Sequence, residues 1–367
     1  MLRTLRITSF RGLREFAMSG LGRVNLLVGT NNCGKTTVLE AIHALAAPGT
    51  VLPLWQAQSR RGELVDNAPE RQIDVAHLVH GHKLVAGAGF HLACNGTDGW
   101  QKLKVSLVPR DALPKGIDDG DDGDTAAAPG LLELLCLQLE WRGGASSNEV
   151  QLPARIVQWP LTRRGGAILH ALGPRDTASA SAVSFVTTEG LTRDSITSMF
   201  ESVVLTPDED TVLRALHTID PAIERIASVG TNGRAASRDA RGGIAMMVAG
   251  QRLPIGSMGD GIWRLLGIAL ALVRARGGVL LVDEIDTGLH YSVLVDMWRL
   301  VFETARSLDV QVFATTHSRD CYEALAAVTE VDRNEISLQR IERGKPEAVA
   351  FSEAEIRQAA ERGLEVR

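Results

Sequence analysis

The stretch Gly29-Thr30-Asn31-Asn32-Cys33-Gly34-Lys35-Thr36, followed by Thr37, decides the fold that we expect. It satisfies the pattern G-x-x-x-x-G-K-[ST], and it stands between an apolar strand at 24–28 and a helical pattern that starts at Lys35. Glycines let the loop backbone approach phosphate oxygens, and the loop amides and the helix N-terminus attract them. We expect Lys35 to reach the terminal phosphates and Thr36 to offer an oxygen to Mg²⁺. The stretch therefore predicts a nucleotide phosphate site.

A pair of carboxylates follows a second apolar strand much later in the chain. Asp283 and Glu284 come directly after the run Val279–Val282. Two adjacent carboxylates beyond four apolar residues repel each other unless a cation lies near them. We therefore expect Asp283 to hold Mg²⁺ through water, and Glu284 to polarise the attacking water as a general base.

A histidine ends a third apolar run. The run Val312–Ala314 is followed by Thr315, Thr316 and His317. Alone, such a histidine is more often an ordinary loop residue. Because it accompanies the two earlier motifs, His317 becomes a candidate sensor of the γ-phosphate.

A second small-residue loop precedes an apolar helical pattern at 262–273. It reads Ile255-Gly256-Ser257-Met258-Gly259-Asp260-Gly261. A loop of this kind that opens a helix can bind an anion, although a glycine-rich turn before a core helix is the plainer interpretation. Since one phosphate cradle is enough for one ATP, a second cradle suggests that it serves the nucleotide of another molecule.

The composition excludes several classes of protein. The chain has 367 residues, of which 45% are hydrophobic, so it can bury one large core or two modest ones. With 39 Lys and Arg against 44 Asp and Glu, its formal charge of -5 makes any DNA contact local or shared with a partner. The longest apolar run, 265–273, is too short for a membrane helix, and the N-terminus lacks the apolar core of a signal peptide. Four separated cysteines without a CxxC pair argue against zinc. We expect a cytoplasmic protein without a membrane partner.

The remaining segments indicate how the chain is organised. Residues 51–176 contain short apolar runs between clusters of Gly, Asn and Asp, which predict antiparallel strands. Residues 177–244 contain two helical patterns, the second opened by a capping box at Thr206, and we expect a short arm for dimer or partner contacts. From Gly278 onward strands and helices alternate, which predicts a parallel sheet. The expected fold is α/β, with a core of residues 1–50 and 245–367, an inserted antiparallel β region and a helical arm.

The order of these motifs resembles the ABC-type ATPase heads of the RecF, SMC and OLD (overcoming lysogenization defect) group. The motifs with the closest resemblance are Asp283-Glu284-Ile285-Asp286-Thr287-Gly288-Leu289-His290 and Ala314-Thr315-Thr316-His317-Ser318, which look like those of the OLD-family ATPases of bacterial anti-phage systems. The resemblance covers about residues 1–50 and 245–330. It implies an ABC-type P-loop NTPase head, with a mixed sheet flanked by helices, that binds and hydrolyses ATP with Mg²⁺.

The resemblance also implies roles for individual residues. By position, Gly29 to Thr37 would be the Walker A loop, Asp283 and Glu284 the Walker B motif, Ser257, Gly259 and Gly261 the signature, Asp286 the D-loop, and His317 the switch histidine. Lys35, Glu284 and His317 would be the catalytic residues. In this group two heads face each other, and each ATP lies between the Walker A loop of one head and the signature of the other. The resemblance therefore implies a homodimer that forms on ATP.

Two positions match the group less well. The group usually has a glutamine loop after Walker A, whereas this chain has Asp74-Val75-Ala76-His77-Leu78-Val79-His80-Gly81-His82 in that region. His77 or His80 could replace the glutamine, and we take His77 as a third candidate on the metal side, with Thr36 and Asp283. Arg11 resembles a basic residue that such heads place near the nucleotide, but a plain turn arginine is an equal interpretation.

The resemblance raises the question of a nuclease. OLD proteins resemble an ATPase fused to a Toprim nuclease, whereas only about forty residues follow Ala327 here. We expect a separately encoded effector, a nuclease of Toprim type, with DNA contacted through the complex in anti-phage defence. The alternatives are a RecF-like repair ATPase that binds DNA ends, an autonomous nuclease with an unrecognised site and, least favoured by the signature wording, a transporter ATPase.

Four weaker signals have plainer interpretations. Asp208 and Asp210 have the spacing of a nuclease pair, but they stand at a helix start, where capping explains them. The run Ile117–Gly123 lacks the ligands of a calcium loop and is interpreted as a solvated linker. The basic pairs Arg60-Arg61 and Arg163-Arg164 are interpreted as solvated surface.

Overall fold

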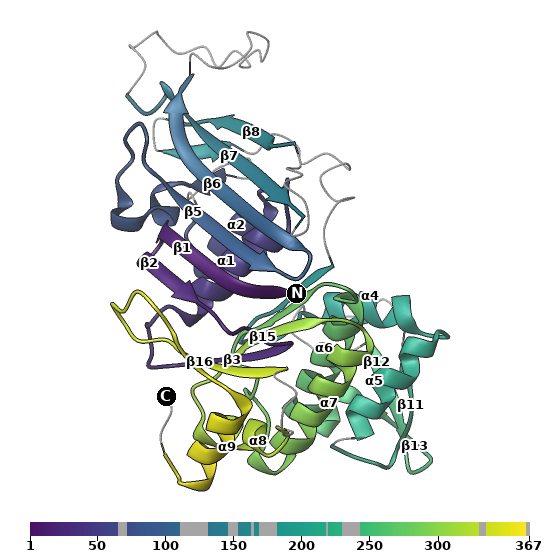
Figure 1. Cartoon of the computed structure of the whole chain (residues 1–367). Coiled ribbons are helices and arrows are strands. Elements are labelled where there is room, and N and C mark those ends of the chain that lie inside the picture. The colour runs from purple at the N-terminus through teal and green to yellow at the C-terminus, as the bar shows by residue number, and fades with distance from the viewer. Residues whose placement is uncertain are drawn as a thin grey trace. The chain divides into compact units, whose positions relative to one another are not determined.

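The computed structural model describes residues 1–64, 72–110, 131–145, 153–162, 165–168, 182–217, 219–229, 243–329 and 335–364 (Figure 1). The chain divides into two compact units. Unit 1 comprises Met1, Met18–Leu39 and Ala182–Arg367, and unit 2 comprises Leu2–Ala17 and Glu40–Ser181. The domain boundaries at residues 50, 176 and 244 stay a prediction. The predicted linker Ile117–Gly123 and the pair Arg163-Arg164 lie outside the described residues.

Unit 1 is built on a six-stranded mixed sheet in the order β10-β14-β15-β3-β16-β17. Its strands are β10 (Val183–Val186), β14 (Val279–Val282), β15 (Gln311–Thr315), β3 (Val24–Val28), β16 (Ile336–Arg340) and β17 (Val349–Phe351). The first five run parallel, and β17 pairs antiparallel with β16. Strands β3, β14 and β15 are buried along their whole length, which explains their continuous apolar sequences. The expected α/β fold class with a mixed sheet is confirmed.

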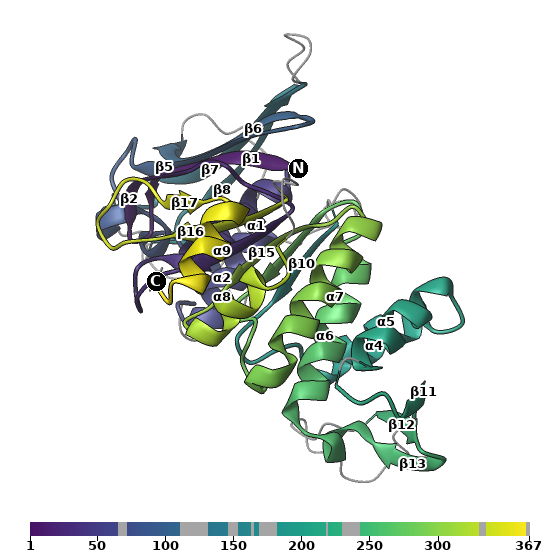
Figure 2. The same cartoon turned by 60° about the horizontal axis from the view of Figure 1, so that its bottom comes forward.

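Helices flank this sheet, and Figure 2 shows α6 and α7 running side by side. The helices of unit 1 are α4 (Arg193–Val203), α5 (Pro207–His217), α6 (Asp260–Arg274), α7 (Leu294–Ser307), α8 (Arg319–Ala326) and α9 (Glu353–Glu361). Helix α1 (Lys35–Ala46) begins in unit 1 and ends in unit 2. Residues 262–273 of α6 are all buried, because α4, α5, α7 and the sheet contact it from different sides. The core of unit 1 therefore forms around the helix that the second small-residue loop opens.

The segment predicted as a helical arm is more varied than we expected. Its two helices, α4 and α5, are present, but the segment also supplies β10 to the main sheet and β11 (Ile223–Ser228) to a smaller one. That smaller sheet is antiparallel and is completed by β12 (Ile244–Val248) and β13 (Gln251–Pro254). At the start of α5 the Thr206 hydroxyl accepts the Asp208 amide, while Glu209 accepts the amide of Leu205 and not that of Thr206. The predicted reciprocal capping box at Thr206 is therefore wrong in its second half.

Unit 2 contains a six-stranded antiparallel sheet in the order β2-β1-β5-β6-β7-β8. Its strands are β1 (Leu2–Phe10), β2 (Leu13–Met18), β5 (Gly89–Gly96), β6 (Gly99–Pro109), β7 (Leu135–Gly144) and β8 (Arg155–Pro160). This unit also holds α2 (Leu52–Arg61), the pair β4 (Gln72–Asp74) and β9 (Gly166–Ile168), and two short 3₁₀ segments, Ala76–Leu78 and His80–His82. Buried and exposed side chains alternate along β5, so one face of the sheet is packed and the other is open. The predicted antiparallel region is present, and the N-terminal strand β1 joins it.

None of the helices in the described ranges combines the length and the apolar character that crossing a membrane requires.

Candidate functional site

The glycine loop lies between β3 and α1, in the predicted order of strand, loop and helix. Gly29, Asn32 and Gly34 adopt positive φ angles of 146°, 60° and 109°. A side chain at Gly29 would overlap the carbonyl oxygen of Ile341, so this close approach requires glycine. The loop residues 30–32 are exposed. The loop conformation is suited to wrapping phosphate oxygens.

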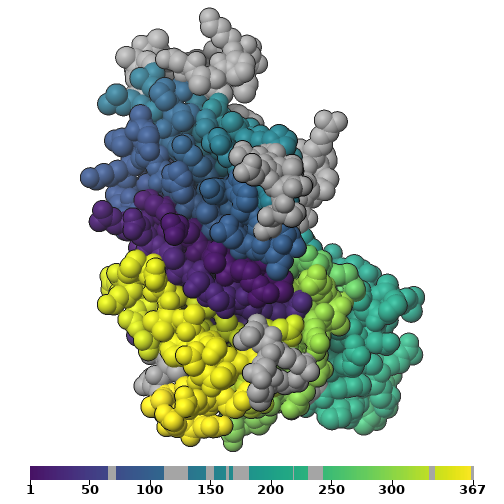
Figure 3. All heavy atoms as spheres, in the orientation of Figure 1, coloured from purple at the N-terminus to yellow at the C-terminus, as the bar shows by residue number. Residues whose placement is uncertain are grey.

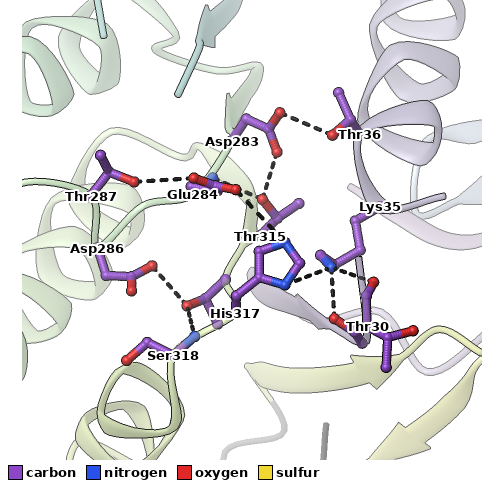
Figure 4. Close-up of polar contacts among 12 residues, drawn as sticks. Thr30, Lys35, Thr36, Asp283, Glu284, Asp286, Thr287, Thr315, His317 and Ser318 are labelled. Carbon is purple, nitrogen blue, oxygen red and sulfur yellow. Dashed lines mark hydrogen bonds and ion pairs between the residues drawn. The ribbon is translucent and has the colours of Figure 1, made fainter. Parts of the chain in front are cut away.

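Lys35 is buried at the start of α1, and its ammonium group lies inside the loop (Figure 4). Its Nζ donates to the carbonyl oxygens of Gly29 at 2.7 Å and Thr30 at 3.1 Å. The Nδ1 atom of His317 lies 3.3 Å from the same Nζ. Burial lowers the pKa of Lys35, although Cys33 and nearby carboxylates partly oppose that shift. The ammonium is held by uncharged carbonyl acceptors, which phosphate oxygens would replace.

Asp283 and Thr36 meet where β14 ends and α1 begins. The Thr36 hydroxyl donates to Oδ2 of Asp283 at 3.0 Å, and the Thr315 hydroxyl donates to Oδ1 at 2.6 Å. Hydroxyl and carboxylate oxygens are the ligands that Mg²⁺ prefers, and it commonly keeps several waters beside them. These two residues therefore fit the metal role that the sequence predicts for them.

Glu284 and His317 form the other side of the same cluster. Glu284 has a positive φ of 48°, and its amide donates to the Thr315 hydroxyl at 2.8 Å. Oε1 of Glu284 lies 3.7 Å from Nε2 of His317. Because an ammonium group can only donate, the contact with Lys35 makes Nδ1 of His317 the acceptor and places the ring proton on Nε2, toward Glu284. Burial and the charge of Lys35 lower the pKa of His317, so the ring is neutral at pH 7.

The predicted D-loop is bonded to the strand end that carries His317. The Thr316 hydroxyl donates to Oδ1 of Asp286 at 2.7 Å and accepts the Ser318 amide at 2.9 Å. Asp286 is therefore bonded to Thr316, the residue before His317, and Thr316 in turn bonds to Ser318, the residue after it.

The predicted signature residues lie at the N-terminus of α6. Gly259 precedes the helix with a φ of 90°, and Ser257 is exposed, with its hydroxyl bonded to the carbonyl oxygen of Pro254 at 2.7 Å. Gly261 lies close to Gly288, because a Cβ built on it would be 3.4 Å from the Gly288 carbonyl oxygen. The signature loop is therefore next to the D-loop and accessible from outside.

Sequence reasoning missed two residues of the site, Arg264 and Thr315. Arg264 lies in the buried part of α6, and its Nη2 donates to the carbonyl oxygens of Asp283 and Glu284, both at 2.8 Å. Its Nη1 donates to the carbonyl oxygen of Thr187 at 2.6 Å. Burial lowers the pKa of this guanidinium, and the nearby carboxylates oppose the shift. An arginine within an otherwise apolar helical run is the signal that could have identified it.

The histidines predicted for the metal side lie in unit 2. Nε2 of His77 is 3.7 Å from Asp74, and its ring packs edge-on against His82 with a centroid distance of 5.4 Å. Nδ1 of His80 is 2.8 Å from the carbonyl oxygen of Arg11. Within the described part of the chain, no group of three or more His, Cys, Asp or Glu side chains could hold a metal ion. The metal role of His77 stays a prediction.

Arg11 is buried in the turn between β1 and β2 and faces two carboxylates. Its Nε lies 3.0 Å from Glu40 and its Nη1 lies 2.6 Å from Glu63. Glu40 also pairs with Arg61 at 2.9 Å, so part of the predicted solvated basic pair belongs to an ion cluster. The structure gives Arg11 a place in this cluster of unit 2, and its predicted role at the nucleotide is not tested by it.

Two family models match the segments that carry the motifs. A model described as "AAA ATPase domain" matches residues 1–69, and one described as "AAA domain, putative AbiEii toxin, Type IV TA system" matches residues 247–320. The first match covers the glycine loop, and the second covers the segments of the signature, Asp283 and His317.

Several proteins are similar to this chain. An ATP/GTP phosphatase of Helicobacter pylori is 21% identical over 366 residues, which cover 89% of this chain and 88% of the relative. The DNA replication and repair protein RecF of Acinetobacter baylyi is 28% identical over 141 residues, which cover 37% of this chain and 38% of the relative. An SMC head domain derived from Pyrococcus furiosus, bound to the C-terminal domain of ScpA, matches with a TM-score of 0.46 and 12% identity over 98% of both chains.

The glycine loop and the cluster around Asp283 lie within the segments that the two family models match. The chain is thus similar to AAA ATPases over residues 1–69 and 247–320, and to RecF over 37% of its length.

Proposed function

We propose that the chain hydrolyses ATP with Mg²⁺ at this cluster. One observation carries the proposal: Lys35, Thr36, Asp283, Glu284 and His317 are linked by contacts of 3.7 Å or less, directly or through the Thr315 hydroxyl. A P-loop lysine, a threonine and aspartate for Mg²⁺, and a glutamate beside them are the groups that phosphoryl transfer to water requires.

Each side chain has a separate task in this proposal. Lys35 and the loop amides bind the phosphates, while Thr36 and Asp283 hold Mg²⁺, which would neutralise charge on the phosphate oxygens. Glu284 accepts a proton from the attacking water. His317, neutral and protonated on Nε2, lies between Lys35 and Glu284 and donates toward the space where the γ-phosphate and water would meet.

We also propose that two copies assemble around ATP. The exposed Ser257 and the adjacent start of α6 support this proposal, because they leave an anion-binding helix end open to a second chain. Glu284→Gln should keep ATP bound, and saturating ATP with Mg²⁺ should then convert the variant to a dimer in light-scattering measurements. The double variant with Lys35→Ala is the matched control and should stay monomeric. A Glu284→Gln chain that binds ATP and remains monomeric would contradict the dimer.

We propose further that the ATP state controls a separately encoded effector, a nuclease of Toprim type, in anti-phage defence. Two observations support this proposal. The sequences of residues 283–290 and 314–318 resemble those of OLD-family ATPases, and residues 247–320 match a model described as a putative toxin. The test is co-expression with the neighbouring gene product, followed by DNA cleavage assays with and without ATP. Cleavage by the pure chain with Mg²⁺ or Mn²⁺ would instead favour an autonomous nuclease.

A second candidate function, direct DNA binding, is favoured by the open face of the antiparallel sheet. Pairing of β1, β5, β6 and β7 puts Arg6, Lys102 and Arg142 in one exposed row on that face. Lys104 is exposed in the next row, whereas Glu140 beside it is buried and accepts from Arg142. Figure 1 shows α2 behind this sheet, and Figure 3 shows the open face. A basic row on an open sheet could follow a phosphate backbone.

The two candidates differ in how the pure chain responds to salt. Direct binding predicts that DNA affinity falls steeply between 50 and 200 mM salt, because a protein that neutralises several phosphates releases their counterions. Lys102→Glu should weaken binding about tenfold or more. Lys345→Glu, an exposed residue of unit 1, is the charge-matched control and should change affinity little. Absence of DNA binding by the pure chain at low salt would reject this candidate.

A further inference from the structure

Thr315 is the last residue of β15, and its side chain is completely buried between two acidic residues of the neighbouring strand end. Its Oγ1 lies 2.6 Å from Oδ1 of Asp283 and 2.8 Å from the backbone nitrogen of Glu284. Figure 4 shows the hydroxyl at the centre of the cluster. One hydroxyl thus contacts both the predicted metal carboxylate and the predicted general base.

The polarity of these two bonds is fixed by chemistry. A threonine hydroxyl has one hydrogen and two acceptor positions. Since the Glu284 amide can only donate, the hydroxyl accepts from it, and its own hydrogen is therefore directed to Asp283. Valine has the same shape as threonine but offers neither bond, whereas serine offers both.

The two bonds constrain the orientation of the Asp283 carboxylate and the strained backbone of Glu284. At Asp283, Thr315 holds one carboxylate oxygen, so the other faces the Thr36 hydroxyl at 3.0 Å. At Glu284, the backbone has a φ of 48°, which costs energy in a residue with a side chain. The Thr315 hydroxyl accepts the amide of Glu284 itself, and the Thr315 carbonyl oxygen accepts the amide of the next residue, Ile285, at 3.0 Å.

We propose that Thr315 is a positioning residue for ATP hydrolysis, which sets the metal carboxylate and the general base relative to each other through one hydroxyl. The proposal rests on the proposed ATPase reaction of the same cluster. Thr315 does not reach the phosphate loop in any contact described above, so its loss should affect the chemical step more than nucleotide binding. Partners that orient a metal ligand typically change activity 10–100-fold when they are removed.

The test measures kcat and KM for ATP, and the Mg²⁺ concentration for half-maximal rate, in Thr315→Val and Thr315→Ser. We expect Thr315→Val to lower kcat about 10–100-fold and to raise the Mg²⁺ requirement, with KM for ATP changed less than about threefold. Thr315→Ser should recover most of the rate. Thr304→Val, which removes a buried hydroxyl from α7 in the same unit, is the matched control and should retain the rate of the unaltered chain.

Each outcome bears on the proposal. Equal kcat in Thr315→Val and the unaltered chain would overturn it, as would a rise in KM alone or a Thr315→Ser variant as slow as the valine variant. If Thr315→Val does not fold, Thr315→Ala removes the same hydroxyl without filling its space, and the same comparison with Thr315→Ser decides. An unaltered chain that hydrolyses no ATP would instead refute the proposed function.

Discussion

Replacing Arg264 by methionine should destabilise the chain and slow ATP hydrolysis together. The guanidinium donates to the carbonyl oxygens of Thr187, Asp283 and Glu284 at 2.6–2.8 Å. Methionine fills similar volume in α6 but donates to none of these carbonyls. Those of Thr187 and Glu284 keep the amides of Gly190 and Thr287, at 2.9 and 3.1 Å. The change therefore removes a buried link between α6, the end of β14 and the turn after β10.

The magnitude follows from these three bonds. A hydrogen bond to a charged group contributes about 1.5–3 kcal/mol, so three bonds set an upper bound of roughly 5–9 kcal/mol. The cost of burying the guanidinium charge, which also lowers the pKa of Arg264, opposes this gain. We expect a net loss of about 3 kcal/mol in the free energy of unfolding. In a unit of this size each kcal/mol lowers Tm by about 2–4 °C, so Tm should fall by roughly 6–12 °C.

The assay is thermal unfolding by calorimetry, with phosphate release measured on the same preparations. Arg274→Met, at the exposed last turn of the same helix, is the matched control and should change stability by no more than about 0.5 kcal/mol. We expect kcat of Arg264→Met to fall about 10–100-fold, because the backbone of Glu284 loses its support. Equal Tm values for the two variants would refute the reasoning.

Three further predictions concern the titratable groups of the two units. Lys35→Ala should abolish ATP binding in calorimetry, and heat of binding equal to that of the unaltered chain would contradict the loop assignment. ATP should raise the lowered pKa of His317 because it brings negative charge close to the ring, so ATP binding at pH 6.5 should take up protons. This uptake is measured as a heat of binding that depends on the buffer. His317→Gln should reduce that dependence, and an unchanged dependence would contradict the predicted shift of His317. Burial lowers the pKa of His43 to about 3, so as pH falls this residue takes up a proton in the unfolded chain before it does so in the folded chain. The free energy of unfolding should therefore decrease below about pH 6.5, by roughly 2–3 kcal/mol at pH 4.5 from this residue alone. His43→Leu should lose less stability than the unaltered chain between pH 7 and 4.5, which denaturant titrations at the two pH values measure.

Local patterns predicted the parts of the site that local chemistry determines. The glycine-loop motif is typical of a strand-loop-helix unit, so β3 and α1 were evident around it. The continuous apolar run Val279–Val282 is typical of a strand buried on both faces, so β14 was evident too. Ser352 and Glu355 form a reciprocal capping box at the start of α9, and such a pair is also local, since its partners are three residues apart.

Contacts between distant segments could not be predicted in this way. Arg264 bonds to the main-chain carbonyls of residues 283 and 284, and Thr315 bonds to the main-chain amide of residue 284. A main-chain partner leaves no residue pattern to find. Strand β10 is short and follows a stretch rich in Ser, Ala and Thr, so its place beside β14 depends on tertiary pairing. The alternation of apolar and polar residues in β1 is typical of a strand but does not tell which sheet the strand joins, and it pairs with β5.

The central claim is that Lys35, Asp283 and Glu284 hydrolyse ATP, and phosphate release with Mg²⁺-ATP tests it most directly. The pure chain is compared with Glu284→Gln and Lys35→Ala, with ATP binding to each measured by calorimetry. We predict that the unaltered chain releases phosphate, that Glu284→Gln binds ATP but loses at least about 100-fold in rate, and that Lys35→Ala does neither. A Glu284→Gln chain that releases phosphate at the rate of the unaltered chain would contradict the claim.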